Sequence, residues 1–173
     1  MALKYNQDLS FAGITKLIEA HSAQIAEFEA WAATGDWEKF HTSHYDWWVF
    51  PVDQPSSYGY RWTVYAGEVA ELKKDARFVE KYLLGVRLVA VSWGWDLYGR
   101  TNLPSPATSQ RWQHWPVRLF KAAQSLRLFS YPDEFESLKL FALDLMKNGE
   151  QMTYNRWDLS WIFTSGIDPY QRS

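Results

Sequence analysis

Apolar residues recur every three or four positions along most of this chain, the spacing that places them on one face of an α-helix. The longest such run extends from Phe78 to Trp93, and a similar run covers residues 10–33. A helix with one apolar side must bury that side against other elements. The pattern therefore predicts an all-α fold, with residues 1–173 forming a single compact domain of six or seven helices.

Capping residues and prolines set the expected helix bounds. The first helix is predicted to start at Ser10 and to end at Gly35. The second is predicted to start at Asp36 and to end at Trp48, before Pro51. The remaining helices are predicted at residues 65–73, 75–93, 112–129 and 132–148, with a short one in the last 24 residues.

Two of these assignments carry further expectations. Residues 86–91 are rich in β-branched side chains, so a strand is the alternative to a helix there. Trp48, Phe50 and Pro51 form the end of the second helix and are predicted to bury their rings against the helix at 75–93. Residues 94–110 are punctuated by Gly and Pro and are predicted to be the longest loop.

The composition excludes several classes of protein. There is no cysteine, which excludes disulfides, thiol catalysis, iron–sulfur clusters and cysteine-based zinc sites. Asp8 and Glu19 interrupt the N-terminal region, and no window of about 18 residues is apolar enough to span a bilayer. We therefore expect a cytoplasmic protein without membrane contact. The net charge of -2 provides no general attraction to nucleic acid, which is not an expected partner.

Positive charge is concentrated in one part of the chain. Residues 97–132 contain no Asp or Glu and carry five positive side chains. Within the predicted helix at 112–129 and just before it, Arg111, His114, Arg118 and Lys121 follow three-and-four spacing. This pattern predicts an accessible basic stripe that binds an anionic small molecule or peptide, with Arg118 at its centre. The alternative is a solvated face neutralised by acids elsewhere in the fold.

Aromatic residues account for 18% of the chain and include 11 tryptophans. The loop expected at residues 52–60 and the residues just after it hold three of these rings, on Tyr58, Tyr60 and Trp62. Exposed rings of this kind offer rigid apolar contact area together with a polar group. We include these three residues among the candidate ligand-binding residues.

The sequence offers one candidate polar cluster for catalysis or metal binding. His41 and His44 stand three positions apart, with Glu38 one turn earlier as a possible third zinc ligand. The spacing differs from the HExxH arrangement, so we expect no metal and no cofactor. An enzyme that uses His41, His44 and Asp46 on a phosphorylated or sugar substrate is the alternative to a binding module. Asp53 could pair with Asp46 as a second carboxylate.

Two short blocks resemble the conserved domain of the opioid growth factor receptor family. Its Y-I-Q-W-L-F-P ending is similar to residues 45–51, which share Tyr45, Trp48, Phe50 and Pro51. Its His followed by R-I-T-R-I-L-x-S-L is similar to residues 114–126, which share His114, Arg118, Ser125 and Leu126, with Lys121 in place of an Arg. The resemblance implies an all-helical binding module. We carry no ligand over from it.

Overall fold

The computed structural model describes residues 2–171, and their secondary structure is mostly helical. Within this part of the chain the seven α-helices are α1 (Ile14–Thr34), α2 (Trp37–Thr42), α3 (Asp46–Val49), α4 (Ala66–Lys74), α5 (Ala76–Ser92), α6 (Pro116–Leu128) and α7 (Pro132–Lys147). Two small antiparallel sheets supplement them, formed by β1 (Trp95–Asp96) with β2 (Thr101–Asn102) and by β3 (Thr153–Tyr154) with β4 (Trp157–Asp158). A 3-10 helix, η1, covers Ser160–Phe163. The expectation of six or seven helices is confirmed, and the two sheets correct the expectation of a purely α fold.

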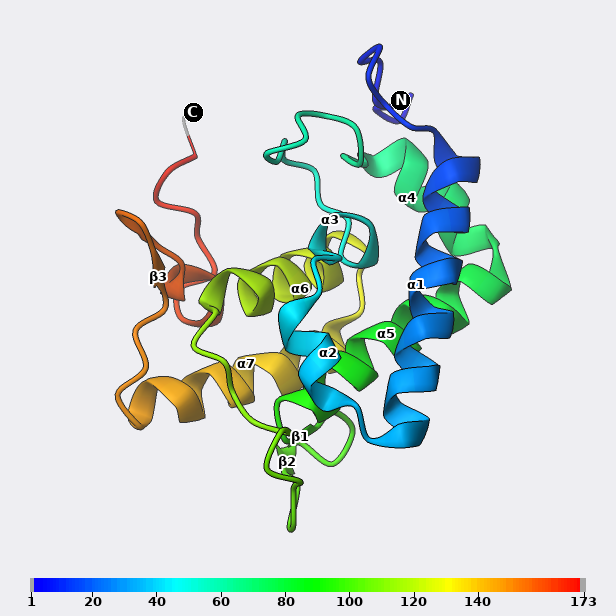
Figure 1. Cartoon of the computed structure of the whole chain (residues 1–173). Coiled ribbons are helices and arrows are strands. Elements are labelled where there is room, and N and C mark those ends of the chain that lie inside the picture. The colour runs from blue at the N-terminus through cyan, green and yellow to red at the C-terminus, as the bar shows by residue number, and fades with distance from the viewer. Residues whose placement is uncertain (1, 172–173) are drawn as a thin grey trace.

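The helix α5 passes through the middle of the fold. It packs against α1, α2 and α4, while α6 and α7 pack against each other on the side of the molecule away from α1 (Figure 1). Asp75 caps α5 by accepting the backbone N–H groups of Arg77 and Phe78. Residues 86–91 are helical, so the prediction of a helix is confirmed there and the strand alternative is wrong.

The first helix begins later than its sequence suggests. The chain enters α1 at Gly13, and the hydroxyl of Ser10 contacts Asp8 instead of capping the helix. The end of α1 follows the prediction, because Gly35 adopts the left-handed conformation with φ 72° and the following Asp36 N–H binds the carbonyl of Trp31.

The predicted second helix is interrupted. It divides into α2 and α3, and residues 43–45 between them leave the helical path. Phe50 and Pro51 at its end are buried as predicted, but Trp48 is only half-buried. The Trp48 ring packs against that of Trp62 at a centroid distance of 5.6 Å, so the prediction of a fully buried ring is wrong for this residue.

The two loop-rich regions are more ordered than their composition predicts. The loop at 94–110 begins with the β1–β2 hairpin, in which Trp95 pairs with Asn102. The C-terminal residues form β3, β4 and η1 in place of a single short α-helix. This segment, red in Figure 1, contacts α6 and α7. It thereby closes one side of the candidate site described below.

Candidate functional site

The predicted basic stripe does not exist as a continuous helix face. Helix α6 begins at Pro116, whose fixed backbone suits the first helical position, so Arg111 and His114 precede the helix. Arg111 is exposed on the loop. His114 has a positive φ of 57°, and its Nδ1 lies 2.7 Å from Oε2 of Glu150. These two residues therefore point away from any shared stripe with α6.

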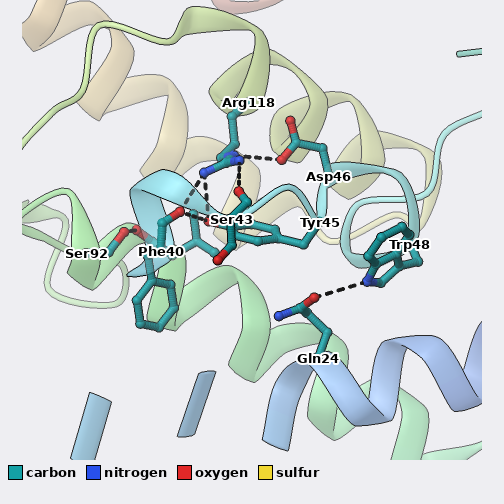
Figure 2. Close-up of polar contacts among 9 residues, drawn as sticks. Gln24, Phe40, Ser43, Tyr45, Asp46, Trp48, Ser92 and Arg118 are labelled. Atoms are coloured by element: carbon teal, nitrogen blue, oxygen red, sulfur yellow. Dashed lines mark hydrogen bonds and ion pairs between the residues drawn. The ribbon is translucent and has the colours of Figure 1, made fainter. Parts of the chain in front are cut away.

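Arg118 is buried, with 5% of its surface exposed, and all its guanidinium nitrogens are occupied. Nε donates to Oδ1 of Asp46 at 2.6 Å. One terminal nitrogen donates to the carbonyl of Phe40 and the hydroxyl of Tyr45, at 2.7 and 3.0 Å, and the other donates to the carbonyl of Ser43 at 2.8 Å (Figure 2). The prediction that Arg118 is accessible to a ligand is wrong, because its partners are supplied by the protein itself.

This network explains why the predicted second helix is interrupted. The carbonyls of Phe40 and Ser43, at the end of α2, accept hydrogen bonds from Arg118. In a continuous helix these carbonyls would accept from backbone N–H groups of the next turn. Burial raises the pKa of Tyr45 above its ordinary value, so its hydroxyl stays protonated and donates to the carbonyl of Phe40 at 2.8 Å. Arg118 thus fixes α3 against α6 and sets the position of Trp47 on α3.

Lys121 lies one turn after Arg118 and has a different environment. Its Nζ is 5.6 Å from the centroid of the Trp47 ring, within the range of a cation–π interaction. The four ion pairs formed by the described residues do not include it. Burial lowers the pKa of Lys121, Asp46 opposes this effect, and the charge of Arg118 adds to it. Lys121 is therefore a partly desolvated cation without a carboxylate bound to it.

The ammonium of Lys121 borders a cavity of about 470 Å³. Its walls come from four segments: His44 with α3, the loop at 52–57, Trp115 with α6, and the C-terminal residues 154–170. Seven of the 19 residues in its wall carry aromatic rings: Trp47, Trp115, Phe120, Tyr154, Trp157, Trp161 and Tyr170. A partly open cavity lined by many rings and a few polar groups has the general character of a small-molecule site.

Helix α6 presents one side to this cavity and another to the core. Val117, Phe120, Lys121 and Gln124 line the cavity at helical spacing. Leu119, Ala122, Ala123 and Leu126 are buried in the hydrophobic core. The apolar packing of the second set holds the first set in place, so the cavity wall is built on a rigid element.

None of the three predicted aromatic residues lines this cavity. Tyr58 is exposed and packs edge-on against Trp47, at a centroid distance of 4.8 Å. Trp62 borders a narrow crevice that it shares with Trp47 and Lys121. Tyr60 is exposed and borders neither space. The loop contributes Gln54, Pro55, Ser56 and Ser57 to the cavity instead.

The predicted histidine cluster is divided. His44 and Asp46 line the cavity, whereas Nε2 of His41 lies 2.8 Å from the carbonyl of Ser109. Burial lowers the pKa of His41, with the Ser109 hydrogen bond opposing it. Across residues 2–171 no group of three or more His, Asp or Glu side chains is placed to hold a metal ion. Nor is any helix of that region long and apolar enough to cross a membrane.

Sequence reasoning missed most of the cavity wall. Of the seven predicted ligand-binding residues, Lys121 alone lines the cavity. The rings on Tyr154, Trp157, Trp161 and Tyr170 were not among the predicted ligand-binding residues, although with Phe163 they place five aromatic residues within 17 positions. That density, next to a polar Asp168, is the signal that could have indicated a binding surface.

Comparison with known proteins gives no relative for this chain. No family model matches the sequence, and neither the curated proteins nor the solved structures contain a match.

Proposed function

We propose that this protein binds a small organic anion, whose carboxylate or phosphate contacts Lys121 and whose apolar body lies among the rings of the cavity. The observation that carries the proposal is that Lys121, which forms no ion pair among residues 2–171, lines the cavity and holds its ammonium beside the Trp47 ring. An opposite charge held in such a partly desolvated place is attracted more strongly than at an open surface. A bound anion would replace the carboxylate partner that the protein does not supply.

The size of the cavity favours a small molecule over a macromolecule. A volume of about 470 Å³ lies within the usual range for small-ligand sites, and it would accept one or two residues of an acidic peptide. Nucleic acid would require several accessible cations along one surface. With Arg118 buried and His114 paired to Glu150, this region does not offer them.

The test compares ring-bearing anions with neutral analogues of the same shape. Phenyl phosphate and benzoate should bind, and phenol and benzamide should bind at least about tenfold more weakly, because a charged hydrogen bond contributes roughly 1.5–3 kcal/mol. Isothermal titration calorimetry gives the affinity, and quenching of tryptophan fluorescence gives an independent signal from the cavity rings.

Two variants assign the binding to the cavity. Lys121→Met should weaken phenyl phosphate binding by about tenfold or more. The matched control, Lys147→Met, removes an exposed lysine from the last turn of α7 and should leave the affinity unchanged. Equal binding of charged and neutral probes, or an unchanged affinity in Lys121→Met, would overturn the proposal.

A catalytic role for this site has weaker support. His44 is exposed at the cavity, with its ring 6.3 Å from that of Trp115, and could take part in proton transfer to a phosphorylated or sugar substrate. Asp46, the carboxylate that would assist it, is already held by Arg118. Release of nitrophenol from p-nitrophenyl phosphate, lost in His44→Gln, would favour this alternative over simple binding.

We also retain as a proposal the kinship with the opioid growth factor receptor domain. Its support is that the two resembling blocks meet in space. Arg118 and Tyr45, which match family positions in different blocks, are joined by a hydrogen bond of 3.0 Å.

A further inference from the structure

The C-terminal side of the cavity carries a charge opposite to that of Lys121. Asp168 lines the cavity and is half-buried. Its Oδ1 accepts the backbone N–H of Tyr170 at 2.8 Å. No ion pair among residues 2–171 includes this carboxylate. Asp168 therefore retains acceptor positions for another donor.

Aromatic rings accompany Asp168 in the cavity wall. Trp157 and Tyr170 meet edge to face, with their centroids 4.7 Å apart, and Trp161 lines the cavity as well. The faces of such rings attract ammonium groups, and a carboxylate beside them adds direct charge attraction. This combination is suited to an alkylammonium group and disfavours an anion.

Lys121 and Asp168 border different spaces next to the cavity. Lys121 also borders the narrow crevice beside Trp47 and Trp62, which Asp168 does not reach. Asp168 also borders an adjoining groove of about 780 Å³ that contains Arg127, and Lys121 does not reach that groove. The cavity wall thus carries a cation next to the crevice and a carboxylate next to the groove.

We infer that the natural ligand is dipolar, with a phosphate or carboxylate at Lys121 and an alkylammonium group at Asp168. This inference rests on the proposed function, because it takes Lys121 as the anion site. Asp46, the other acid in the wall, is neutralised by Arg118. A zwitterion would therefore leave no uncompensated charge in the cavity, whereas a simple anion would leave Asp168 unmatched.

The experiment uses two probes of the same shape. Phosphocholine carries both charges, and 3,3-dimethylbutyl phosphate replaces the trimethylammonium group by an uncharged tert-butyl group. Calorimetry should show that wild-type protein binds phosphocholine about tenfold more tightly, since the cation is held by rings and by a carboxylate. Equal affinities for the two probes would overturn the inference.

The variant Asp168→Asn tests whether Asp168 causes the preference for phosphocholine. The amide oxygen of Asn can still accept the Tyr170 N–H, so the segment keeps its local hydrogen bond. The variant should lose about tenfold in phosphocholine affinity and stay within about twofold for 3,3-dimethylbutyl phosphate. Asp133→Asn, at an exposed position on α7, is the control and should change neither affinity.

The outcomes separate this inference from the proposed function. If Lys121→Met weakens the binding of both phosphates and Asp168→Asn changes neither affinity, anion binding stands and the cation subsite is refuted. This result is expected if Asp168 interacts with Arg127 of the adjoining groove and not with a ligand. If Lys121→Met changes neither, both proposals fail. Sedimentation with phosphatidylcholine vesicles identifies the source of the group: co-sedimentation that free phosphocholine competes away supports a lipid headgroup, and phosphocholine binding without co-sedimentation supports a free solute.

Discussion

His21 should make this protein sensitive to acid in a way that one substitution can remove. The side chain is fully buried on α1, against the rings of Phe78 and Tyr82. Neither ring nitrogen has a hydrogen-bond partner. Burial, and secondarily the charge of Lys81, lowers the pKa of His21 from 6.5 to about 3. The native state therefore holds the imidazole neutral, and the unfolded chain protonates it.

The sign and size of the effect follow from this difference. Above pH 6.5 the imidazole is neutral in both states and contributes no pH dependence. As the pH falls from 6.5 toward 3, the unfolded state takes up the proton first, so the free energy of unfolding decreases by about 1.4 kcal/mol per pH unit. Between pH 7.5 and 4.5 this amounts to about 2.7 kcal/mol.

The assay is urea denaturation of wild-type protein and His21→Leu at pH 7.5, 6.5, 5.5 and 4.5. The effect of His21 is given by the difference in unfolding free energy between wild-type protein and the variant, because the carboxylates titrate in both proteins. It should grow by about 2.7 kcal/mol toward pH 4.5 in favour of the variant. At pH 7.5 the variant should already be more stable by about 1–3 kcal/mol, because two unsatisfied polar atoms are removed from the core.

Two further proteins keep the test falsifiable. His21→Gln also cannot titrate, and its curve should show the same loss of acid dependence even if packing lowers its stability. His44→Leu removes an exposed imidazole and should retain the wild-type dependence. Parallel curves for wild-type protein and both His21 variants between pH 6.5 and 4.5 would refute the reasoning.

Two other predictions follow from the site. Arg118→Met should lower the free energy of unfolding by about 3–5 kcal/mol in urea titration, because it leaves Asp46 buried without its partner. Arg118→Lys should not restore the stability, because one ammonium cannot reach all four acceptors of Arg118. A loss below about 1 kcal/mol in Arg118→Met would contradict this account. Phenyl phosphate binding should decline as the pH rises through the lowered pKa of Lys121, below the ordinary lysine value of 10.5, because only the protonated amine attracts the anion. Lys121→Arg should remove that decline below pH 10.5, and a decline that persists in this variant would assign it to another group.

The parts of the fold that depend on neighbouring residues were predictable from the sequence. The run from Phe78 to Trp93 and the cap at Asp75 together define α5, because both signals act within a few turns. The left-handed residue at Gly35 likewise ends α1 where expected. These features require no knowledge of what packs against the helix.

The errors arise where a distant residue decides the outcome. The break between α2 and α3 is made by Arg118, which lies 72 positions beyond Asp46. The ion pair between Arg118 and Asp46 could not be predicted for the same reason, because the two residues are far apart in the sequence. The absence of acids in residues 97–132 therefore indicated free cations. No acid among residues 2–171 forms an ion pair with Lys121, so its predicted role in ligand binding stays a prediction. The cavity itself combines α3 with the C-terminal rings, and no local pattern connects residues so far apart.

The walls of the cavity have a consequence for the kinetics of folding. Asp46 comes from the first third of the chain and Lys121 and Asp168 come from the last third, so the cavity exists only after long-range contacts have formed. A ligand of this cavity would therefore bind the native state and would bind only weakly to a transition state in which these segments are not yet assembled. Such a ligand slows unfolding and leaves the rate of folding almost unchanged. Occupancy of the cavity would thus lengthen the lifetime of the folded protein without helping a new chain to fold.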